Sequence, residues 1–96
     1  VDQNDRKMQT FRNSLSDMSN GERGKGKLYG EREKLMRMYE RMKNELQTYE
    51  NNIGFLSISS KGGGGLLKEM ERKIDKLKDE MALIIKKIDA IDENLE

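Results

Sequence analysis

The residues best suited to a chemical role lie in a glycine-rich segment near the start of the chain. Gly21, Gly26 and Lys27 match the spacing G-x-x-x-x-G-K of phosphate-binding loops. That loop also needs a following Ser or Thr to hold magnesium and a buried strand before it. Leu28 replaces the hydroxyl, and the preceding residues have the pattern of a helix end. We therefore expect residues 20–27 to be a basic glycine linker rather than a nucleotide site.

Composition excludes most other catalytic and metal-binding chemistry. The 96 residues include no His and no Cys, so the commonest catalytic base, thiol nucleophiles, disulfides and typical zinc ligands are all missing. The carboxylates show no calcium-loop spacing. We expect no enzymatic activity, no cofactor, no metal and no small-molecule substrate.

Basic residues are concentrated in residues 23–43, although the net charge of the chain is only +1. Such a stretch can bind nucleic-acid phosphates. Glu31, Glu33 and Glu40 interleave with it, so a solvated helix face is the other interpretation. A run of four glycines beside Lys61 leads into the start of a predicted helix. The free N-H groups of such a helix start make it a second candidate anion site. The candidate phosphate contacts are Arg23, Lys25, Lys27, Arg32, Lys34 and Lys61.

Two heptad patterns predict the long helices that carry these residues, because their apolar residues alternate in steps of three and four. We expect helices over residues 27–52 and 65–95. At 1.5 Å per residue the second would be roughly 45 Å long, which is too long for the core helix of a small globule. The first series is Leu28, Leu35, Tyr39, Met42, Leu46, Tyr49 and Ile53, with Arg32 at one position; the second is Leu67, Met70, Ile74, Leu77, Met81, Ile84, Ile88, Ile91 and Leu95.

A shorter series predicts a third helix over residues 3–19, with Met8, Phe11, Leu15 and Met18 on one face. Residues 53–65, with their run of glycines, would form the tip joining the two long helices. An antiparallel arrangement of those helices brings opposite charges together, which favours this orientation over a like-charge one. The charges concerned are Arg32, Lys34 and Arg37 on one helix and Asp89, Asp92 and Glu93 on the other.

The predicted fold is all-α: an antiparallel two-helix coiled-coil hairpin with a short N-terminal third helix, as in a three-helix bundle. Residues 1–96 would form a single helical domain. Only 33% of the residues are hydrophobic and 39% are charged, which suits narrow helical seams rather than a large core. Because the chain opens at Val1 rather than Met, we expect it to be a segment of a longer protein.

Apolar residues outside the seams indicate a surface for protein partners. Some widen the apolar stripes of the long helices beyond what one neighbour covers. Others lie in the predicted tip, where they either fold back to close the end of the hairpin or are displayed to a partner. The candidate interaction residues are Met36, Met38 and Ile85 on the helices, with Leu66 also in excess of the seams, and Phe55, Leu56 and Ile58 in the tip.

These patterns predict a non-enzymatic interaction or spacer module. Its partner would be a second copy of the chain or another protein. The alternative is a nucleic-acid or ribosome-associated accessory that binds phosphate through residues 23–43. No stretch approaches the roughly 20 apolar residues of a membrane span, and no signal-peptide pattern is present. We therefore expect no membrane partner and a cytoplasmic location.

The region around the predicted tip resembles a known bacterial family. Residues 49–55 (Tyr-Glu-Asn-Asn-Ile-Gly-Phe), followed by Ser-Ser-Lys, glycines and Leu-Leu-Lys-Glu at 66–69, are similar to the C-terminal helical region of proteins, mostly from the Bacteroides lineage, with tandem repeats of domain-of-unknown-function family 349. The resemblance covers roughly residues 28–95. The chain lacks the Trp typical of those repeats, so the resemblance implies the hairpin that follows them. It implies a helical segment of a larger cytoplasmic protein and no catalytic residue.

Overall fold

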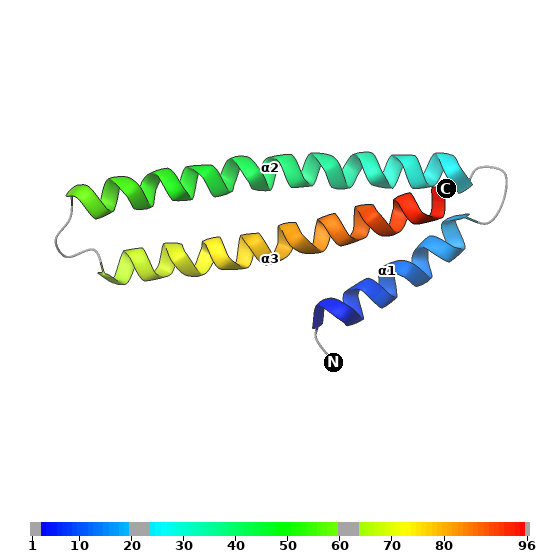
Figure 1. The fold of residues 1–96 in the computed structure, drawn as a ribbon, viewed down its shortest axis with the longest axis horizontal. Helices are drawn as coiled ribbons and strands as arrows, with labels where there is room; N and C mark the ends of the chain where they lie inside the picture. Colours follow the sequence, from blue (N-terminus) through cyan, green and yellow to red (C-terminus); the bar gives the residue numbers. More distant parts are fainter. Residues whose placement is uncertain (1–2, 20–23, 60–63, 96) are drawn as a thin grey trace.

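The computed structural model describes residues 3–19, 24–59 and 64–95, and these residues form three helices and no strand. The helices are α1 (Gln3–Ser19), α2 (Gly24–Ser59) and α3 (Gly64–Leu95). α2 and α3 run side by side and antiparallel along an elongated shape of 60 × 28 × 15 Å, and α1 packs at an angle near the end of α3 (Figure 1). The predicted all-α hairpin with a short third helix is confirmed.

The predicted seams form the contact between α2 and α3. On α3 the series is buried from Ile74 through Ile91, and on α2 the side chains of Leu28 and Leu35 are buried. The remaining seam residues of α2, from Tyr39 to Ile53, are half-buried. Burial is therefore deepest at the end of the hairpin that α1 also covers, and it decreases towards the tip.

α1 adds a second buried face to α3. Leu15 of α1 is fully buried, as is Ala90 of α3, which lies outside the predicted seam. Leu83, also outside the seam, is buried in the same cluster with Met8 of α1. Because a helix that packs against two neighbours needs a wider apolar stripe than a two-helix seam provides, these residues complete the core. The two-helix heptad pattern did not reveal them.

The predicted boundaries of the second helix are wrong. α2 extends over Gly24–Ser59 instead of residues 27–52, so it absorbs part of the predicted linker 20–27 and of the predicted tip 53–65. Asn and Gly had indicated helix ends, but a Gly inside a helix costs only about 1 kcal/mol relative to Ala. With no Pro in the chain, pairing with α3 can outweigh that cost. α3 begins within one residue of its predicted start, and α1 matches residues 3–19.

Candidate interaction surface

An ion pair joins the two long helices near the end of the hairpin that α1 covers. The Arg32 Nε group donates a hydrogen bond of 2.7 Å to Oδ1 of Asp92, between the first turns of α2 and the last turns of α3. This bond and the charge on Asp92 raise the pKa of the Arg32 guanidinium above its ordinary value. The predicted meeting of a basic helix start with an acidic helix end is confirmed at this pair. Arg32 thus occupies a position of the apolar seam, and its charge is paired there with that of Asp92.

α1 is held on the hairpin by polar contacts around its buried residues. The Arg12 Nη1 group lies 3.4 Å from Oε2 of Glu93 on α3. The Lys87 ammonium lies 5.3 Å from the centre of the Phe11 ring, within the range of a cation–π contact. Both contacts join α1 to the last third of α3. α1 therefore covers one side of the hairpin at its open end and leaves the other side bare.

The bare side carries two helical stripes of exposed residues, which together we call the back face. Within each stripe the residues are separated by three or four positions, so they lie along one line of a helix. The α2 stripe is Tyr29, Glu33, Met36, Glu40 and Lys43, and the α3 stripe is Lys78, Ala82, Ile85 and Asp89. Asp89 stands at the margin, where it also lines a surface hollow with Asp5 and Arg12 of α1.

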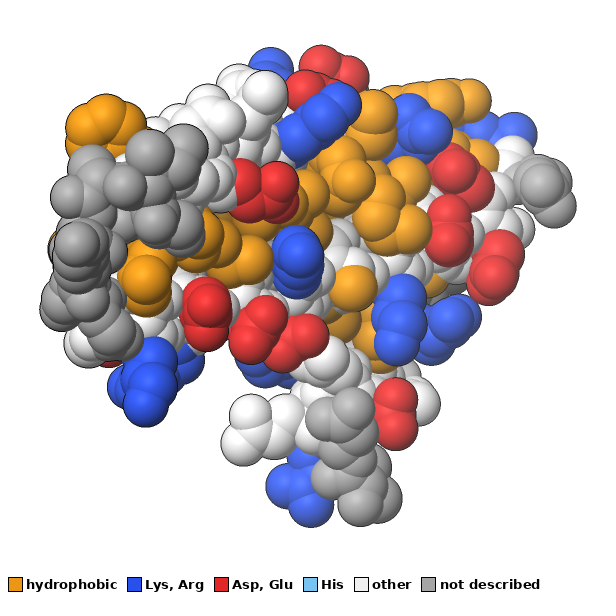
Figure 2. Space-filling view, turned by 60° about the vertical axis from the view of Figure 1, so that its left-hand side comes forward, with side chains coloured by type: hydrophobic (Ala, Val, Ile, Leu, Met, Phe, Trp, Pro, Cys, Tyr) orange, Lys and Arg blue, Asp and Glu red, His pale blue; other side chains and the backbone are white. Residues whose placement is uncertain are grey.

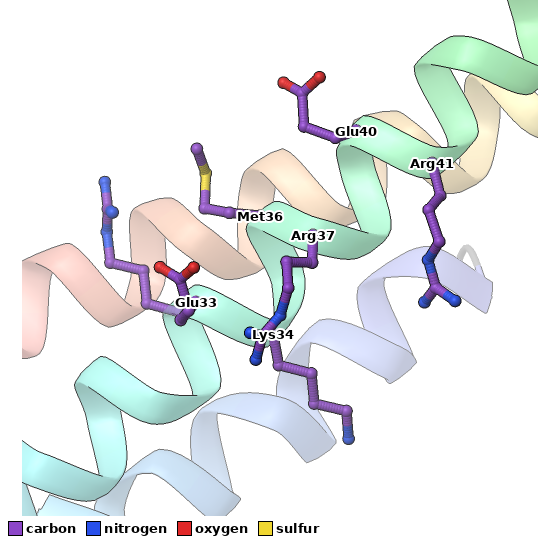
Figure 3. A pocket seen from close by; sticks show the side chains of 7 residues that line it. Glu33, Lys34, Met36, Arg37, Glu40 and Arg41 are labelled. Atoms are coloured by element: carbon purple, nitrogen blue, oxygen red, sulfur yellow. The ribbon is translucent and has the colours of Figure 1, made fainter.

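Two large apolar side chains are exposed near the middle of the back face. Met36 is 37% exposed and Ile85 is 41% exposed. In Figure 3, Met36 and Glu40 point to one side of α2, whereas Lys34 and Arg41 point to the side on which α1 lies. On the face of the molecule drawn in Figure 2, hydrophobic side chains reach the surface as a band between charged ones. Apolar patches rimmed by charge are typical of protein-binding surfaces, and Met36 and Ile85 are the candidate residues for such a patch on this face.

Met38 does not belong to this surface. The sequence placed it with Met36 among the excess apolar residues, but its side chain is half-buried and packs against the hydrophobic core. The physical reason is the third helix: α1 widens the core on its own side of α2, and Met38 lies on that side. The candidate interaction residues on the long helices are therefore Met36 and Ile85.

The predicted tip residues have a different setting from the one expected. Phe55, Leu56 and Ile58 all belong to the last turns of α2 rather than to a connection. The Phe55 side chain is 69% exposed, so it does not close the end of the hairpin. Leu66, in the first turns of α3, is 54% exposed. The side chains of Leu56 and Ile58 lie outside the described part of the structure.

The candidate phosphate contacts do not form one site. Lys25, Lys27 and Lys34 are exposed on α2, whereas Arg32 is engaged with Asp92. Arg23 and Lys61 lie outside the described residues. Of the segment that matched a phosphate-binding loop, the described part is helical from Gly24 onwards, so Gly24 and Gly26 do not form an open loop that cradles a phosphate, and Gly21 lies outside the described residues.

A second polar contact lies towards the tip. The Tyr49 hydroxyl donates a hydrogen bond of 3.2 Å to Oε1 of Glu45, one turn earlier in α2. This bond, together with desolvation of the phenol, raises the pKa of Tyr49 above its ordinary value. The two residues line a shallow hollow between α2 and α3 with Lys73 and Lys76.

Residues 3–19, 24–59 and 64–95 contain no cluster of three or more acidic side chains that could hold a metal ion. Within the same ranges, none of the helices has an apolar stretch that could cross a bilayer. Comparison with protein-family models, curated proteins and solved structures finds no match to this chain.

Proposed function

We propose that the chain is a non-enzymatic helical interaction module and spacer that associates through its back face. The observation that carries the proposal is the exposure of Met36 and Ile85 on the side of the hairpin that α1 leaves bare. Burying such side chains between helices is favourable by about 1.5 to 3 kcal/mol for each one fully buried. The elongated shape, 60 Å along its longest axis, suits a spacer as well as a binding surface.

The test compares two double variants with the wild-type chain by light scattering and small-angle X-ray scattering at two concentrations. Met36→Glu with Ile85→Glu should abolish association while leaving the helical circular dichroism unchanged. Phe55→Glu with Leu66→Glu is the matched control, because it makes the same changes at exposed apolar residues near the tip. Association lost only in the tip variant, or a wild-type chain that stays monomeric, would contradict the proposal.

The alternative is a nucleic-acid or ribosome-associated accessory that binds phosphate through residues 23–43. One observation favours it: Lys27, Lys34 and Arg41 recur every seven residues of α2, which places them along one exposed edge. Binding to RNA or DNA should weaken steeply as salt rises, because each phosphate contact releases counterions. An Lys34→Glu, Arg41→Glu variant should bind less. Absence of binding at low salt removes this alternative.

The cytoplasmic location and the resemblance to family 349 stay predictions from the sequence. Neither bears on the back face, whose residues are defined by their exposure and their positions along α2 and α3.

A further inference from the structure

We infer that the back face docks a second copy of this chain, antiparallel to the first, so that α2 lies on the partner's α2 and α3 on the partner's α3. This inference rests on the proposed function and adds the partner and the register. Its basis is the order of charges and apolar residues along the two stripes. Each stripe becomes complementary to itself when it is turned end for end.

The α3 stripe shows this self-complementarity most clearly. Lys78 and Asp89 stand at its two ends, with Ala82 and Ile85 between them. When two such stripes lie antiparallel about their midpoint, each Lys78 meets the partner's Asp89, and each Ile85 meets the partner's Ala82. A two-fold interface repeats every contact, so the Lys78–Asp89 pair forms twice and the apolar contacts lie at the centre.

The α2 stripe follows the same rule. Turned end for end about its midpoint between Met36 and Glu40, it brings Glu33 against the partner's Lys43. Tyr29 then lies level with the partner's Gln47, which is also exposed on α2. Opposite charges again lie on either side of the central residues, where each Met36 lies level with the partner's Glu40.

One two-fold axis can serve both stripes. Counting along both helices from the Arg32–Asp92 pair places the midpoint of the α2 stripe within one helical turn of the midpoint of the α3 stripe. An axis that crosses both helices at that level relates the two stripes simultaneously. The intramolecular register of the hairpin therefore aligns two complementary patterns that lie far apart in the sequence.

The back face runs along the length of the hairpin. The molecule is 60 Å along its longest axis, and a stable interface needs about 800 Å² from each partner. Among the described residues, no ion pair within the chain involves Lys78, Asp89, Glu33 or Lys43, so docking would not have to break one. Charge at the ends of each stripe would set the register, while Ile85 against the partner's Ala82 would supply the buried contact at the centre.

Charge reversal tests the register directly. In sedimentation equilibrium, Lys78→Asp and Asp89→Lys should each weaken the dimer at least about tenfold, because each places two like-charge pairs in the interface. The double variant Lys78→Asp, Asp89→Lys should restore the dimer. Lys78 and Asp89 are eleven residues apart on one helix, roughly 16 Å, so rescue cannot arise within a chain. Lys68→Asp, an exposed change nearer the tip, is the control.

The outcomes separate this inference from the proposed function. A dimer that is lost on Met36→Glu with Ile85→Glu but is indifferent to the charge reversals overturns the register and leaves the back face as the interface. Failure of the double variant to restore the dimer also overturns it. A wild-type chain that is monomeric, or a dimer that tolerates glutamate at Met36 and Ile85, overturns both proposals. Circular dichroism of each variant shows that the helices have formed.

Discussion

The guanidinium of Arg32 and the carboxylate of Asp92 lie 2.7 Å apart although sixty positions separate them in the chain. Arg32 occupies a position of the α2 seam that would otherwise be apolar. A charged residue within a heptad seam can specify orientation and register at some cost in stability. Because Asp92 supplies the matching charge only when α3 runs antiparallel to α2, this pair favours the observed hairpin.

Reversal of this pair should reveal its role in orientation. Arg32→Asp and Asp92→Arg should each lower the urea midpoint of unfolding, and the combined swap should recover much of the loss. The effect should shrink at high salt, since both side chains are partly exposed. Arg72→Asp is the control, because Arg72 pairs only along its own helix with Glu69, at 3.6 Å. A swap no more stable than its single variants would argue against a specific pair.

Leu15 should anchor α1 to the hairpin. Its side chain is fully buried against the core formed with α2 and α3, and truncation of such a residue typically costs about 2 to 5 kcal/mol. Leu15→Ala should therefore lower the free energy of unfolding by an amount in this range, measured by urea denaturation. Amide hydrogen exchange should rise most in α1. The exposed Leu66→Ala is the control, expected within about 0.5 kcal/mol of wild type.

Gly30 should limit the stability of α2. It lies inside the helix, and a Cβ atom added there would meet no atom within 4 Å apart from those of the adjacent residues and the local helix backbone. Gly30→Ala should therefore raise the free energy of unfolding by about 0.5 to 1 kcal/mol, because Ala loses less backbone entropy on forming a helix. Gly54→Ala tests the same effect near the tip, where a Cβ also meets open space. A loss of stability at either position would mean that the added methyl group disturbs packing.

Tyr49 should ionise at a higher pH in the folded chain than in the unfolded chain. Its hydroxyl donates to Glu45, and this bond is the main cause of its raised pKa. Because the folded pKa exceeds the unfolded value of about 10, the contribution to stability is fully present below pH 10 and is lost as pH rises through the folded pKa. The ring-carbon NMR signal of labelled Tyr49 reports the midpoint. Glu45→Gln should lower that midpoint, and an unchanged value would contradict the assignment.

The back face illustrates how far sequence patterns reach. Met36 and Ile85 were recognisable as apolar residues outside the seams, and the structure leaves both exposed. Met38 was grouped with them because its position on α2 also falls outside the two-helix seam. Its actual setting depends on where α1 packs, and the short α1 pattern does not specify a partner face. The same dependence explains why the burial of Leu83 and Ala90 was missed.

The heptad spacing along the chain was sufficient to predict the helical class and the α2–α3 seam, because it is a local property of the sequence. The opposite charges on the two long helices were sufficient to predict their antiparallel orientation, because charge complementarity depends only on pairs of residues. The true ends of α2 and the division of its faces into core and surface required the folded arrangement. Glycines are weak helix breakers whose effect packing can override, and a face becomes core only when a neighbouring helix covers it. For this chain, α1 is that neighbour, and the side it leaves bare is the surface on which the proposed function depends.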